Sequence, residues 1–255
     1  MAIAADCKSA AFGHRWFESS PAHKNMKKPA FQISKEDIEH IFSILKKIEK
    51  EKIKREVRII GFDVLRTLVS SHEWKIIQRV RKIDPRKHGF KGPYFGIEKV
   101  PAQLVAIKNQ KYTYKKSIKK IETQYLPRNV YRIYKKLQDA LHRELGSRLF
   151  IESGYRSPAF QVILFLHYLQ FYGFNFNKTV RRVAVPGYSE HCSPRNQAMD
   201  IITSRGIPSD TKPLDFSKTK EYAWLLEHAH EYGFHQSYPR NNKLGVMFEP
   251  WHWRC

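Results

Sequence analysis

Two histidines and two carboxylates in the second half of the chain have the residue types and spacing of a catalytic metal site. His191 precedes Asp200 by nine positions, and Glu249 precedes His252 by three. A zinc hydrolase needs about three histidine or carboxylate ligands, an open position for water and a nearby base. If Pro250 interrupts the regularity of the last predicted strand, Glu249 and His252 converge on one side, with Glu249 beside the ligands rather than among them. Taken alone, neither pair distinguishes a metal site from hydrogen-bonded structural residues.

Short strands and a turn would position these side chains. A predicted strand ends at "SG" (153–154), so that Tyr155 and Arg156 are presented at a strand end. Pro158 then begins a helix, because its missing N–H would be unpaired in a first turn. The strands that this half of the chain predicts cover residues 148–152, 181–187, 198–203 and 246–254.

Helices are predicted on both sides of these strands. Ser34 and Asp37 have the spacing of a capping pair at a helix start, and Gly233 is a typical helix end. The Gly- and Pro-rich segment 84–96 predicts a loop, and residues 103–117 predict a short hairpin. Apolar residues at helical spacing recur in segments 33–54, 64–80, 128–145 and 218–232.

The positive charge is concentrated in the first half. The net charge is +22, and residues 26–150 hold 31 Lys and Arg against 13 Asp and Glu, whereas residues 151–255 hold 12 against 9. This distribution predicts either a polyanionic neighbour (nucleic acid, anionic lipid or a cell-wall polymer) or a soluble surface.

No apolar run reaches the roughly 18 residues of a membrane span. The cysteines are too widely spaced for a disulfide framework or a CxxC metal site, at Cys7, Cys192 and Cys255.

The first 25 residues have a composition unlike the rest of the chain. "RWFESSP" (15–21) is what a reading frame yields through a tRNA gene, and "DCKS" (6–9) fits the anticodon region of such a gene. We therefore expect residues 1–25 to be a mis-called start and the protein to begin at Met26. Neither Met1 nor Met26 is followed by a charged segment and a long apolar segment, so no secretion signal is expected.

Four motifs of the second half occur together in the order of a known family. They are "SGYRS" with Gln161, "PGYSEH…AMD" (186–200), "YGFHQSYPRNN" (232–242) and the highly specific "EPWHWR" (249–254). Over about residues 126–254 the chain resembles the VanY-type D-alanyl-D-alanine carboxypeptidases. These are zinc peptidases that trim peptidoglycan stem peptides and share a fold with the hedgehog signalling domain.

The resemblance implies a role for each matching residue. The expected zinc ligands are His191, Asp200 and His252. Glu249 takes the place of the catalytic carboxylate that accepts a proton from water, and Arg156 that of an arginine that stabilises the oxyanion. The expected substrate-binding residues are Tyr155, Gln161 and Ser189.

The loop between the first two expected ligands departs from the family pattern. The common pattern SxHxxGxAxD puts seven steps between His and Asp, whereas His191 and Asp200 are nine apart. Asn196 stands where the pattern has glycine, and Pro194 lies in the longer loop. We expect the ligands to be kept, and the loop geometry and substrate detail to differ.

The motifs and elements together predict an α+β fold, with a small antiparallel sheet flanked by helices and a basic, mainly helical N-terminal region. We expect residues 1–25 to lie outside the fold, residues 26–125 to form the basic region, and residues 126–255 to form the zinc peptidase domain.

The activity that the resemblance implies is Zn²⁺-dependent removal of the terminal D-Ala of peptidoglycan stem peptides. An L,D-carboxypeptidase or a phage-type endopeptidase on the same scaffold is the first alternative. A basic nucleic-acid-binding protein with non-catalytic zinc is the second, although no recognition helix accompanies the charge. We expect the basic region to attract anionic cell-envelope polymers. The family implies action at the cell envelope, whereas the missing secretion signal points to the cytoplasm.

Overall fold

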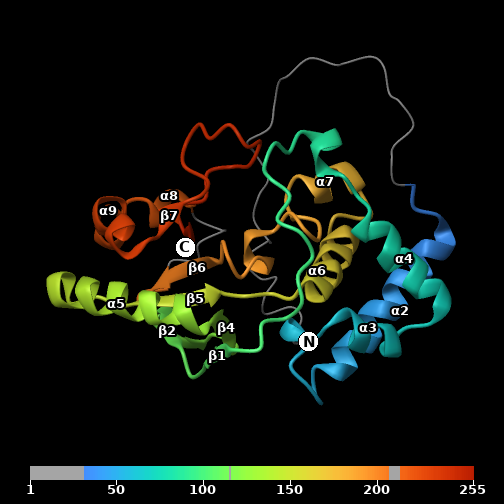
Figure 1. Cartoon of the computed structure of the whole chain (residues 1–255), viewed down its shortest axis with the longest axis horizontal. Coiled ribbons are helices and arrows are strands. Elements are labelled where there is room, and N and C mark those ends of the chain that lie inside the picture. Colours follow the sequence, from blue (N-terminus) through green and yellow to red (C-terminus); the bar gives the residue numbers. More distant parts are fainter. Residues whose placement is uncertain (1–31, 115, 207–212) are drawn as a thin grey trace.

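The computed structural model describes residues 32–114, 116–206 and 213–255, so the expected mis-called start at 1–25 lies outside the described residues. The first part of the described chain is helical, as expected (Figure 1). Its elements are α2 (Lys35–Glu51), η2 (Val57–Ile59), α3 (Phe62–Leu68), α4 (Ser71–Arg81) and η3 (Pro85–His88). Among the described residues, no helix combines the length and the apolar composition needed to cross a bilayer.

Capping side chains decide where these helices begin. The predicted pair is confirmed at α2, where the Ser34 hydroxyl accepts from the Asp37 N–H at 3.0 Å and the Asp37 carboxylate accepts from the Ser34 N–H at 2.9 Å. The prediction of one helix over 64–80 is wrong. Ser70 and Glu73 form a second capping box, which ends the first helical segment and begins α4.

The segment expected to form one hairpin forms two separate strand pairs. β1 (Leu104–Ile107) pairs with β4 (Gln124–Pro127), and between them β2 (Lys111–Tyr114) pairs with β3 (Ser117–Lys120). The reason lies at Gln110. Its buried side-chain amide bonds both the N–H and the carbonyl of Ile151, at 2.8 and 2.9 Å, and thereby separates β1 from β2.

A four-stranded antiparallel sheet carries the expected site. Its order is β5-β6-β8-β7, and its strands are β5 (Leu149–Ser153), β6 (Ala198–Thr203), β7 (His235–Gln236) and β8 (His252–Arg254). α5 (Arg128–Leu145) and α9 (Lys220–His228), which continues into η5 (Ala229–Tyr232), pack beside this sheet (Figure 1). The short helix α8 (Pro213–Phe216) precedes α9. The α+β class is therefore confirmed.

Two strand predictions in this half are wrong. Residues 181–187 form turns and irregular backbone instead of a strand. Val183 and Val185 are buried in the cluster that the helices share, and Gly187 has a φ of +87°, outside the extended region of a strand. The last strand covers only 252–254 rather than 246–254, since Pro250 has no N–H to donate to a neighbouring strand.

The helix α6 (Pro158–Phe171) joins the basic region to the sheet. It is apolar on nearly every side, a pattern typical of a helix that is covered all round. α2, α3 and α4 pack against it and share one hydrophobic cluster with it and α7 (Phe176–Val180). The basic N-terminal region thus supplies part of the core on which α6 rests. The domain boundary at residue 126 stays a prediction.

Candidate active site

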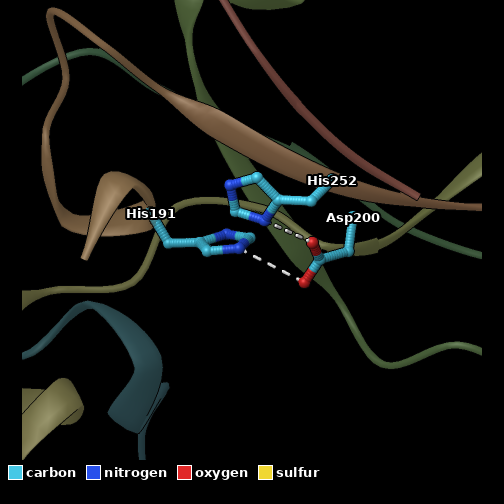
Figure 2. A group of neighbouring side chains, drawn as sticks. All are labelled: His191, Asp200 and His252. Atoms are coloured by element: carbon cyan, nitrogen blue, oxygen red, sulfur yellow. Dashed lines mark hydrogen bonds and ion pairs between the residues drawn. The ribbon is translucent and has the colours of Figure 1, made fainter. Parts of the chain in front are cut away.

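Strand register brings two of the predicted ligands together. Asp200 on β6 lies directly opposite His252 on β8, and directly opposite residues of an antiparallel pair project from the same face. His191 reaches the same point from the short helix η4 (Glu190–Cys192), which precedes β6. Figure 2 shows the Asp200 carboxylate facing both imidazoles.

The donor atoms of these three side chains converge. Asp200 Oδ1 lies 2.9 Å from His252 Nδ1, and Asp200 Oδ2 lies 3.2 Å from His191 Nε2 (Figure 2). One ligand atom from each residue falls within 4.8 Å of the others. Two imidazole nitrogens and one carboxylate oxygen are a donor set that Zn²⁺ takes in hydrolases, with a further position open to water. The residues present therefore fit the expected metal.

His191 presents its Nε2 because its other ring nitrogen is already bonded. Nδ1 lies 2.9 Å from the carbonyl oxygen of Gly154, an arrangement in which Nδ1 carries the proton and Nε2 keeps its lone pair. Gly154 is required at this point. A Cβ there would lie 2.3 Å from the carbonyl oxygen of Tyr125, against which this turn packs.

Burial and mutual charge set the ionisation of the ligands. Burial opposes the charged Asp200 carboxylate, but the two histidines outweigh it and hold the Asp200 pKa well below its usual range. Burial also opposes a charged His252, yet hydrogen bonds to Asp200 and Glu190 raise the His252 pKa to about 10. Burial, assisted by the nearby Arg156 charge, lowers the pKa of His191 and favours its neutral form.

Glu249 lies beside the ligands. Its Oε2 is 3.8 Å from His252 Nδ1, and its backbone N–H donates to the Tyr238 carbonyl at 3.0 Å. Burial, with the nearby negative charges of Asp200 and Glu190, raises the Glu249 pKa to about 7 despite the opposing charge of His252. A carboxylate with a pKa near neutrality is well matched to taking up a proton from water.

The remaining predicted residues lie around this centre. Arg156 follows β5, donates its backbone N–H to the His191 carbonyl at 3.0 Å, and has no hydrogen-bond partner for Nε within the described part of the chain. Tyr155 is buried, and its hydroxyl also has no hydrogen-bond partner there.

Gln161 is buried in α6 with its amide bonded to the Ala184 carbonyl at 2.6 Å, and Ser189 is buried directly before η4. The substrate-binding roles of Tyr155, Gln161 and Ser189 stay predictions.

The longer loop between His191 and Asp200 is taken up locally. Backbone bonds close it in two steps, from Ser193 N–H to the Glu190 carbonyl and from Asn196 N–H to the Ser193 carbonyl. The two extra residues therefore do not separate the ligands.

Comparison with known proteins agrees with this geometry. The family model described as "VanY: D-alanyl-D-alanine carboxypeptidase" matches residues 123–255, just over half of the chain. The chain belongs to the VanY family. All three converging donors, Glu249 and Arg156 lie within the matched region.

Individual relatives of this VanY-family chain include carboxypeptidases. It is 33% identical over 138 residues to the putative carboxypeptidase YodJ of Bacillus subtilis (strain 168). The matched region covers 53% of this chain and only 48% of YodJ. Among solved structures it is similar to the LD-carboxypeptidase LdcB, at 30% identity and a TM-score of 0.51, over 67% of this chain and 77% of the other. A Zn(II) complex of the vancomycin-resistance D,D-pentapeptidase VanY matches at 28% identity and a TM-score of 0.41, over 51% and 72% of the two chains.

Two residues that contact His252 were not among the site residues predicted from the sequence. Glu190 contacts the His252 ring, and the ring of Tyr238 lies 4.8 Å from that of His252, centroid to centroid. Glu190 stands directly before His191 in "SEH", and an acidic residue beside a predicted histidine ligand was the available signal. Tyr238 lies within "YGFHQSYPRNN", but no spacing rule connects it to His252.

Proposed function

We propose that this chain is a zinc-dependent D-alanyl-D-alanine carboxypeptidase that removes the terminal D-Ala of peptidoglycan stem peptides. The observation that carries the proposal is the convergence of His191, Asp200 and His252 beside Glu249 in a chain of the VanY family. The chain spans about half the length of the curated relative that it matches.

His191 Nε2, Asp200 and His252 Nδ1 would hold the zinc ion. When bound, Zn²⁺ supplies Lewis-acid activation of water and of the scissile carbonyl. The buried surroundings strengthen each charge interaction in the site. Glu249, whose pKa is about 7, accepts the proton of the attacking water and then delivers it to the leaving amine of D-Ala.

Arg156 is the proposed oxyanion stabiliser. Its guanidinium is close enough to His191 and Glu249 to influence the pKa of each, and Nε has no hydrogen-bond partner among the described residues. Two backbone hydrogen bonds fix the position of the turn that carries Arg156. The Arg156 N–H bonds the His191 carbonyl at 3.0 Å, and the next residue, Ser157, donates its N–H to the Arg58 carbonyl at 2.8 Å. The basic N-terminal region therefore supports the turn that carries Arg156.

Defined stem peptides test the substrate assignment. We expect the zinc-loaded protein to release free D-Ala from a pentapeptide ending in D-Ala-D-Ala and to leave the corresponding tetrapeptide intact. The similarity to LdcB makes L,D-carboxypeptidase activity the second candidate, and release of D-Ala from the tetrapeptide alone would favour it. Cleavage of cross-linked peptides without release of D-Ala would identify an endopeptidase. Salt-sensitive DNA binding with no hydrolysis would support the nucleic-acid alternative.

We further propose that the protein acts at the cell envelope and that its basic surface attracts anionic envelope polymers. The β2–β3 pair supports this proposal, because Lys111 and Lys120 lie directly opposite each other and are both exposed. Like charges in that position destabilise a strand pair unless an anion lies nearby. Retention on purified cell walls is expected to fall as salt rises and to weaken in Lys111→Gln/Lys120→Gln. Retention that is indifferent to both would contradict the proposal.

A further inference from the structure

The imidazole of His252 makes a second polar contact on the side away from Asp200. Its Nε2 lies 2.9 Å from Oε2 of Glu190, a side chain only 5% exposed. We propose that Glu190 is a positioning residue that holds the His252 ring with Nδ1 directed at the metal. This inference rests on the zinc site proposed above. This assignment goes beyond the ligands and the catalytic carboxylate.

The contact determines which nitrogen of His252 is available. A carboxylate accepts hydrogen bonds and, when ionised, has no proton to donate, so the nitrogen facing Glu190 carries the ring proton. Nδ1 faces Asp200, where the metal would bind, so the neutral ring that a metal requires keeps its proton on Nε2 and presents the Nδ1 lone pair. His191 has the complementary arrangement, in which Nδ1 faces the Gly154 carbonyl and Nε2 faces Asp200. Each imidazole is therefore anchored through one nitrogen and presents the other.

Glu190 is itself held in place by its neighbours. The Ser237 hydroxyl donates to the same oxygen, Oε2, that faces His252. Arg254 Nε lies 3.6 Å from the other oxygen, Oε1. Glu190 also precedes His191 directly, so it connects the helix η4 that carries one ligand to the strand β8 that carries another. Removing a hydrogen-bond partner of this kind from a ligating histidine weakens metal affinity by about 10- to 100-fold.

The test is zinc affinity rather than turnover alone. In competition with a chromophoric chelator, Glu190→Ala is expected to raise the zinc dissociation constant by about 10- to 100-fold relative to the unchanged protein. Glu190→Gln keeps an oxygen that can accept the Nε2–H bond, so a smaller increase is expected. Glu221→Gln is the matched control. It removes the charge of another buried glutamate, on α9, and is expected to bind zinc as the unchanged protein does.

A spectroscopic readout separates positioning from simple support of the fold. In ¹H–¹⁵N spectra of zinc-loaded, isotope-labelled protein, His252 is expected to show a protonated Nε2 and a metal-bound Nδ1. The Nε2 proton signal should be lost or broadened in Glu190→Ala, while the thermal melting of the metal-free variant shows whether it folds. If that variant does not fold, Glu190→Gln is used, with a weakened, shifted Nε2 proton signal as the expected result.

The proposal would be overturned by a folded Glu190→Ala that binds zinc as tightly as the unchanged protein. A His252 ring bound to zinc through Nε2 would overturn it as well, as would an unaltered Nε2 proton signal in Glu190→Gln. In each case the unchanged protein still binds zinc and releases D-Ala, so the proposed function survives. Loss of zinc binding and hydrolysis by the unchanged protein contradicts the proposed function instead.

Discussion

Glu249→Gln is expected to retain zinc and to lose nearly all peptidase activity. Glutamine preserves the volume of the side chain but cannot take up a proton at neutral pH, and general-base catalysis is worth about 10²- to 10⁴-fold in rate. Glu249 lies near the ligands without belonging to the converging donor set, with Oε2 at 3.8 Å from His252 Nδ1. D-Ala release from a pentapeptide measures the loss, and metal analysis of the same sample measures the zinc.

An exposed glutamate provides the control for this substitution. Glu227→Gln changes the same functional group at an exposed position on α9 outside the converging donor set, and should leave turnover and zinc content unchanged. Full activity of Glu249→Gln would refute the assignment of the base. Loss of zinc together with activity would instead make Glu249 part of the metal-holding set.

His252→Ala is expected to abolish stable zinc binding. The substitution removes one of three ligands and also leaves the Asp200 and Glu190 carboxylates without the ring that both contact. Metal content after gel filtration and competition with a chelator measure the effect. His235→Ala, an exposed histidine on the neighbouring strand β7, is the control and should bind zinc normally. Zinc retained at full stoichiometry and affinity in His252→Ala would place the metal elsewhere.

The same ligand gives zinc binding a pH dependence. The His252 pKa of about 10 in the metal-free protein means that its ring is protonated at pH 7. Zinc needs the Nδ1 lone pair, so binding must expel a proton. Apparent affinity should therefore rise about tenfold per pH unit from pH 7 toward 10, and level off above it. Calorimetry in buffers of different ionisation enthalpy measures the released proton, and a value near zero would argue against a charged His252.

Local signals predicted much of the fold. Ser34 and Asp37 cap α2 as their spacing indicates, and Gly233 ends the helical segment 220–232 in the left-handed conformation. Such signals act over three or four residues, so they are visible in the sequence. The strand pairing of residues 103–127 was not visible, because it depends on Gln110 bonding the distant backbone of Ile151.

The sequence by itself determined which chemistry the site can hold, through the types and order of His191, Asp200, Glu249 and His252 in motifs of one family. Only the tertiary structure decided how these residues meet. Asp200 faces His252 because β6 and β8 pair in one register, and a shift of one residue would turn the side chain to the other face. The role proposed for Glu190 likewise depends on contacts across 62 positions of the chain, which no local pattern specifies.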